Sequence, residues 1–204
     1  INITPPISKS AQQLADIKRY LTEQNIEPIT VGEDSVLVQI QPEQSPIAKG
    51  VAILIPDWNH SLSSPKAITS LRERLPESGW VTMAAQPPQM DENIDQLIRA
   101  YYQDKLKAED SAIQPSNEPT TQDSDSTASE NEQASEPLAM YKEKLTALMK
   151  VLMEKAYNYP GIFIVIAEGT NAALLTELYH ENAIERPSAF ILLSASSELV
   201  DKMC

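Results

Sequence analysis

The chain has 204 residues, 42% of them hydrophobic, and a formal net charge of −13 at pH 7. This length allows one hydrophobic core, and the acidity argues against nucleic acids and anionic membranes as partners because phosphate is bound by clustered Lys and Arg. The single cysteine, Cys204, is the last residue, which excludes an intrachain disulfide and a cysteine-based metal site. The longest uninterrupted apolar run, residues 162–167, is too short for a transmembrane helix of roughly 20 residues.

The N-terminal part of the chain predicts a helix followed by a β-hairpin. Residues 10–24 carry leucine and isoleucine at helical spacing. Residues 29–31 and 35–41 have the alternation of strands, and residues 32–34, Gly-Glu-Asp, supply the turn between them. We therefore expect an antiparallel pair at this end of the fold.

Four later strands are apolar on both faces, as parallel strands are when helices cover both sides of a sheet. They span residues 50–55, 80–85, 161–167 and 189–194. Helices are predicted at residues 64–75, from Asp91, from Pro137 and at residues 171–181. The repeated order of strand, helix and strand predicts an α/β fold with a doubly wound, mostly parallel sheet.

Residues 111–136 form an acidic segment that is rich in Ser, Thr, Gln, Asn, Glu and Pro. It has almost no large apolar side chains, so burial cannot offset the entropy lost on ordering it. We interpret it as a disordered insertion in a single domain that spans residues 1–204. The alternative, an acidic loop that binds a metal or a partner, lacks the ligand spacing of a calcium loop.

The most informative stretch is residues 160–172, where a buried strand runs into a tight turn and then a helix. In a strand-turn-helix corner of the form Gly-x-Ser-x-Gly, the serine is a nucleophile whose hydroxyl points into an active site. Here the corner reads Ala-Glu-Gly-Thr-Asn from residue 167 to residue 171, which puts Gly169 at the nucleophile position. The corner of a hydrolase is predicted, but its nucleophile is absent.

Two blocks carry a resemblance to a known family. Residues 71–83 read LRERLPESGWVTM, and residues 162–175 contain the strand, the glycine turn and an alanine-containing helix. The first block resembles the Leu-Arg-x-x-Leu-Pro-x-x-Gly-Trp-x-Thr signature of an uncharacterised bacterial α/β-hydrolase-like family, a domain of unknown function. The resemblance covers nearly the whole chain outside the acidic segment.

The resemblance implies an α/β-hydrolase fold in a periplasmic or secreted protein with no established activity. The first residues have neither the basic nor the apolar region of a signal peptide, so we expect that any secretory signal has been removed or lies outside this sequence. In this fold the catalytic acid and histidine follow the last strands, whereas this chain stops at Cys204, just after the predicted strand at residues 189–194. Either the chain is a fragment truncated at its C-terminus, or the last strands of the family are lost.

Three residues are candidates for catalysis if the protein is an enzyme. Thr170 becomes the corner nucleophile if the register slips by one; otherwise it is a residue of the first helical turn whose hydroxyl caps that turn. Glu168 is either a general acid or base or a turn carboxylate stabilised by the helix N-terminus. His60, in the loop after residues 50–55, is either a base or a solvent-facing histidine.

Four further residues are candidates for ligand binding because they lie in the two loops at the predicted carboxyl edge of the sheet, where open α/β folds bind ligands. They are Asp57, Trp58, Gly169 and Asn171. Trp58 either contacts a ligand or anchors its loop on the core. The sequence has no His/Cys/carboxylate metal cluster and no glycine-rich phosphate loop, so we predict no metal and no cofactor.

These observations leave three hypotheses. The first is a catalytically degenerate hydrolase-fold domain of the cell envelope that binds a small molecule or an envelope protein, of unknown identity, through the two loops. The second is an esterase-like hydrolase with an atypical nucleophile, or with its catalytic acid and histidine on a missing C-terminal segment. The third is a purely structural domain.

Overall fold

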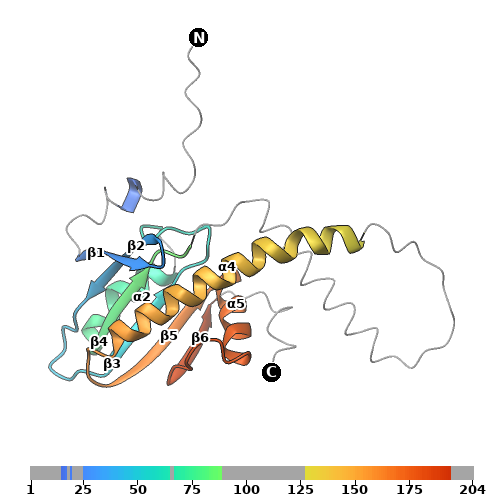
Figure 1. Cartoon of the computed structure of the whole chain (residues 1–204). Coiled ribbons are helices and arrows are strands. Elements are labelled where there is room, and N and C mark those ends of the chain that lie inside the picture. Colours follow the sequence, from blue (N-terminus) through green and yellow to red (C-terminus); the bar gives the residue numbers. More distant parts are fainter. Residues whose placement is uncertain (1–14, 18, 20–24, 65–66, 89–126, 194–204) are drawn as a thin grey trace, which may run out of the picture. The chain divides into compact units, whose positions relative to one another are not determined.

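The computed structural model describes residues 15–17, 19, 25–64, 67–88 and 127–193 (Figure 1). By its internal contacts the chain divides into two units, one of Ile1–Gln89 with Lys144–Cys204 and one of Met90–Glu143. The first unit contains the whole sheet and both loops of interest. The prediction of a single domain stays a prediction, and residues 111–126 of the proposed insertion lie outside the described residues.

The first unit is built on a six-stranded mixed sheet with the strand order β1-β2-β4-β3-β5-β6. Strands β1 and β2 form an antiparallel hairpin, and β2 also pairs antiparallel with β4. Pairs β3–β4, β3–β5 and β5–β6 are parallel. The strands are β1 (Ile26–Val31), β2 (Asp34–Gln41), β3 (Gly50–Ile55), β4 (Trp80–Ala85), β5 (Ile162–Glu168) and β6 (Ala189–Leu193).

This topology confirms the prediction of four parallel strands preceded by a hairpin. From β3 the chain continues to β4, which lies on one side of β3 in the sheet. It then returns to β5 on the other side of β3 and continues outward to β6. A parallel sheet that reverses direction in this way, with an antiparallel hairpin before it, has the strand order of an α/β-hydrolase core. The fold is therefore of the α/β-hydrolase type predicted from the sequence.

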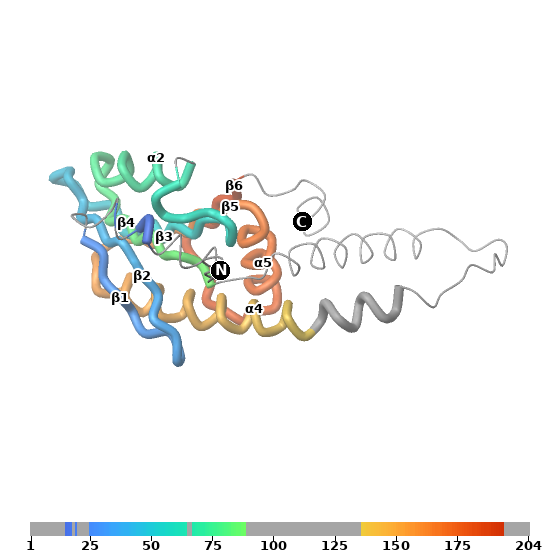
Figure 2. Tube along the Cα trace, turned by 90° about the horizontal axis from the view of Figure 1, so that it is seen from above, coloured from blue at the N-terminus to red at the C-terminus, as the bar shows by residue number. Residues whose placement is uncertain are grey.

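Helices cover both faces of the sheet. Figure 2 shows α2 on one side and, on the other, α5 together with the part of α4 that belongs to the first unit. A short 3-10 helix, η1 (Pro76–Ser78), links α2 to β4 and ends at Gly79, whose φ of 91° is left-handed. The helices are α2 (Ala67–Arg74), α4 (Thr127–Ala156) and α5 (Gly169–His180).

The central strand β3 is buried along its whole length, which explains its unbroken apolar sequence. On one face Ala52 and Leu54 pack in a cluster with Ile68 of α2. The part of α4 that follows Glu143 contributes four side chains that are fully buried, namely Leu145, Leu148, Met149 and Leu152. Each such side chain contributes about 1.5–3 kcal/mol through burial.

Two predicted elements differ from the structure. Strand β6 was expected to be buried on both faces, but it lies at the edge of the sheet, and Ile191 is 40% exposed. No described strand pairs with its outer edge, and the prediction of a strand buried on both faces was wrong. The helix expected from Pro137 already begins at Thr127, because the preceding residues include the good helix formers Ala, Glu and Gln. The helix predicted from Asp91 and most of that at residues 10–24 lie outside the described residues.

Candidate functional site

The site is built where two neighbouring strands end at the same edge of the sheet. Parallel strands β3 and β5 are in register, and Ile55 lies opposite Ala167. Continuing each chain by two residues brings the β3 loop to Asp57 and the β5 corner to Gly169. The chain continues from β3 to β4 and from β5 to β6, and these two connections run in opposite directions along the sheet. The position between β3 and β5 is therefore a topological switch point, where open α/β sheets form a binding crevice.

The corner after β5 has the geometry of a nucleophile turn. Glu168 still has an extended backbone, with φ −116° and ψ 143°, whereas Gly169 has φ 61° and is the first residue of α5. A left-handed φ costs an ordinary L-residue free energy but is freely adopted by glycine. Gly169 therefore occupies the corner, and Thr170 lies one residue beyond it, in the first turn of the helix.

The carboxylate of Asp57 fills the space in front of this corner. Its Oδ1 accepts hydrogen bonds from the backbone N–H of Thr170 at 2.9 Å and from that of Trp58 at 3.0 Å. An ideal Cβ placed on Gly169 would lie 2.4 Å from both Cγ and Oδ2 of Asp57. Asp57, only 8% exposed, thus occupies the position that a nucleophilic side chain at residue 169 would need.

The two donors that hold Asp57 correspond in position to those of an oxyanion hole. In α/β-hydrolases this hole is made by the N–H of the residue after the nucleophile and by an N–H from the loop after the third strand. Thr170 follows Gly169 at the corner, and Trp58 lies in the loop after β3. Both donors converge on one oxygen, at distances suited to charge-assisted hydrogen bonds.

Next to the corner, His60 and Glu168 form a pair. His60 Nδ1 lies 3.1 Å from Glu168 Oε2, and the side chains are 24% and 7% exposed. A carboxylate that accepts from one imidazole nitrogen fixes the orientation of the ring, as in many acid-base sites. His60 is therefore held by a partner, unlike the solvent-facing histidine that was the alternative expectation. Glu168 is also the N-cap residue of α5, although its side chain makes no capping bond.

Side chains outside the loop hold the β3 loop in place. Gln86, just after β4, accepts from the N–H of Leu62 and donates to the carbonyl of His60. Arg72 of α2 donates to the carbonyl of Leu62 at 2.9 Å, and burial lowers the pKa of its guanidinium, an effect that Glu73 opposes. Sequence reasoning missed both residues, and the signal for Arg72 was a charged residue on the apolar side of a predicted helix.

Two of the predicted ligand-binding residues serve the structure of the loops themselves. Trp58 is only 6% exposed, so it anchors the loop on the core, which was one of the two alternatives. Asn171 is fully buried, and its Nδ2 donates to the carbonyl of Pro56 at 2.8 Å. The side chain of Asn171 thereby ties α5 to the β3 loop. His180 is exposed in the last turn of α5, where a basic residue suits the helix dipole.

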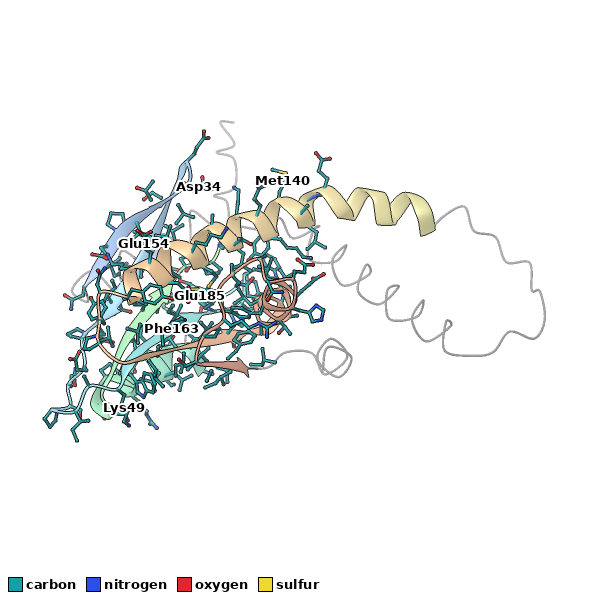
Figure 3. All side chains as sticks on the ribbon, turned by 60° about the horizontal axis from the view of Figure 1, so that its bottom comes forward. Asp34, Lys49, Met140, Glu154, Phe163 and Glu185 are labelled. Atoms are coloured by element: carbon teal, nitrogen blue, oxygen red, sulfur yellow. The ribbon has the colours of Figure 1, made fainter. Side chains whose placement is uncertain are left out.

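A separate cavity of about 250 Å³ lies away from this site. It is lined by side chains at the end of α4, by Tyr157 and by Glu185 of the loop before β6. Glu154 and Glu185 are labelled in Figure 3. Tyr157 forms an edge-to-face contact with Phe163, with ring centroids 5.6 Å apart. Because Tyr157 precedes β5 whereas Gly169 follows it, this cavity belongs to the opposite edge of the sheet.

Among the described residues, no group of three or more His, Cys, Asp or Glu side chains is placed to hold a metal ion. In the same part of the chain, no helix is both long enough and apolar enough to cross a membrane. The three catalytic candidates lie at this corner: His60 pairs with Glu168, and Thr170 donates its backbone N–H to Asp57. The chemistry available there is that of carboxylates, an imidazole and hydroxyl groups.

A family model described as "Protein of unknown function (DUF3530)" matches residues 2–202. The sequence has no significant match among curated proteins.

Several solved structures are similar at low sequence identity. An alpha-beta serine hydrolase homologue from Coxiella burnetii is 12% identical with a TM-score of 0.49, and the match covers 87% of this chain and 67% of that one. XC6422 from Xanthomonas campestris, an a/b serine hydrolase without lid, is 11% identical with a TM-score of 0.46, covering 84% and 61%. Dienelactone hydrolase from Anabaena variabilis is 9% identical with a TM-score of 0.44, covering 88% and 89%. Because these scores lie below 0.5, the fold assignment rests on the strand order.

Proposed function

The chain belongs to the family described as "Protein of unknown function (DUF3530)", and we propose that it is a catalytically degenerate α/β-hydrolase-fold domain that binds a ligand or a protein. The observation that carries the proposal is the corner after β5. Gly169 has no side chain to act as a nucleophile, and the space in front of it is filled by Asp57. Acyl transfer needs a nucleophile, a base within reach and free oxyanion donors.

The loops after β3 and β5 are the part of the domain to which we assign binding. They lie at the switch point of the sheet, and they are tied together by the bonds of Asp57 to Thr170 and of Asn171 to Pro56. A preorganised pair of loops binds with a smaller entropic cost than flexible ones. The resemblance to an envelope family leads us to propose a periplasmic or secreted location, with a small molecule or an envelope protein as the partner.

A serine-directed fluorophosphonate probe tests whether the corner is catalytic. The probe reacts only with a hydroxyl that is activated by a neighbouring base, so the purified chain should remain unlabelled and should not hydrolyse short-chain acyl esters above background. A known serine hydrolase in the same reaction is the positive control. Stoichiometric labelling that disappears in Thr170→Ala would overturn the proposal and make this corner an active site.

One observation favours a second function, an esterase-like hydrolase with an atypical nucleophile. The pair of His60 and Glu168 resembles a base with its orienting carboxylate, at 3.1 Å. For this function Thr170 supplies the hydroxyl and His60 the base. Labelling by the probe that is lost in both Thr170→Ala and His60→Ala would support it. Labelling lost only in Thr170→Ala would point to a different base.

A further inference from the structure

The position of Asp57 implies more than the loss of a nucleophile. Its Oδ1 is held at 2.9 Å by Thr170 N–H and at 3.0 Å by Trp58 N–H, and these are the donors that would face a developing oxyanion. One donor belongs to the first turn of α5, where the helix dipole favours negative charge. The two donors therefore still converge on one anionic oxygen, which belongs to the chain itself.

We propose that Asp57 is an internal ligand that closes an intact oxyanion hole through a contact between the β3 loop and the β5 corner. The contact requires the glycine at the corner, because a Cβ at Gly169 would lie 2.4 Å from the carboxylate. The proposal holds whether or not the domain has any catalytic activity. It concerns only the two backbone donors and the anion that fills them.

The ligand that fits this hole once Asp57 is removed is a small carboxylate. Formate is the smallest probe with the same planar charged group as the lost side chain, and removal of Asp57 beyond Cβ leaves space for it beside Gly169. If Asp57 only capped the N-terminus of α5, formate would bind to the backbone N–H of Thr170 alone. An oxyanion hole has its two donors on different elements, so formate should reach both Thr170 and Trp58.

The test is chemical rescue of Asp57→Ala. We expect this variant of the full chain to lose about 5–10 °C of Tm, because two donors in a buried region lose their charged acceptor. Formate at roughly twenty times its dissociation constant should then recover about 4–7 °C, in a saturable manner that chloride at equal ionic strength does not reproduce. In ¹⁵N spectra, the amide signals of Thr170 and Trp58 should both move with formate.

Asp34→Ala is the matched control for charge. Asp34 has a side chain that is 62% exposed and pairs with Lys144, so its removal changes the net charge equally without opening a hole. Its Tm should not respond specifically to formate. Specific rescue of Asp34→Ala, or a response of Asp57→Ala at Thr170 alone, would overturn the proposal.

Asp57→Asn provides a second measurement that does not depend on the stability of the alanine variant. The amide keeps the shape and one acceptor oxygen but removes the charge, so it should fold and should not bind formate. Its Thr170 and Trp58 amide protons should shift upfield from their wild-type positions, because charge-assisted hydrogen bonds become neutral ones. Unchanged shifts at both amides would show that the carboxylate does not hold these donors, and the proposal would fail.

Discussion

Gly169→Ala tests the arrangement of the corner through stability, and the chain contains its own control for this substitution. Gly32, in the turn between β1 and β2, has the same φ of 61° as Gly169, but a Cβ added there meets nothing within 4 Å. At Gly169 the same Cβ would approach Asp57 to 2.4 Å. The two substitutions therefore have the same φ cost and differ in their contacts.

The expected magnitudes follow from these contacts. A left-handed φ at a residue other than glycine lowers the free energy of unfolding by about 1–2 kcal/mol. Replacing glycine also restricts the unfolded chain, which offsets about 0.4–1 kcal/mol, so Gly32→Ala should lower the free energy of unfolding by about 1 kcal/mol. At Gly169 the Asp57 carboxylate must also move and lose its bond to Thr170, which adds about 1.5–3 kcal/mol. For a chain of this size that difference corresponds to a gap in Tm of about 3–12 °C.

Thermal and urea unfolding followed by far-UV circular dichroism measure the gap. In an Asp57→Ala background the contact is absent, so Gly169→Ala should cost only about as much as Gly32→Ala, about 1 kcal/mol. Equal losses for the two glycines in the wild-type background would refute the reasoning. A gap that persists without Asp57 would show that something other than the carboxylate limits the corner.

Three further predictions concern the rest of the first unit. Gly50→Ala should abolish folding, since its Cβ would lie 1.8 Å from the backbone oxygen of Ile162, and circular dichroism should show no cooperative transition. Leu148→Ala should cost about 2–5 kcal/mol in urea unfolding because this fully buried side chain leaves a cavity. A hydrogen bond with Glu185 raises the pKa of Tyr157 above its usual 10. The stability that this hydrogen bond contributes to the fold is therefore present below pH 10 and is lost as the pH rises through the raised pKa. Glu185→Gln should lower that pKa in an NMR titration of the ring, and an unchanged pKa would contradict the assignment.

Local patterns in the sequence were sufficient to predict much of the fold. The apolar runs at β3, β4 and β5 predicted buried parallel strands, because a strand covered by helices on both sides has no face left for polar residues. The glycine between a strand and a helix predicted the corner at residue 169, because only a few residue types adopt a left-handed φ without strain. Such signals act within a few residues and can be read without knowing the fold.

The contacts that define the site were decided by the tertiary structure. Asp57 and Thr170 are 113 positions apart, and His60 and Glu168 are 108 apart. Nothing in the residues around Asp57 indicates which backbone donors its carboxylate will meet, since that depends on the register between β3 and β5. The apolar sequence of β6 likewise could not distinguish an edge strand from a central one, because that position depends on which strands pair beside it. The sequence alone determined that a glycine stands at the corner, and only the packing of two distant loops determined what lies in front of it.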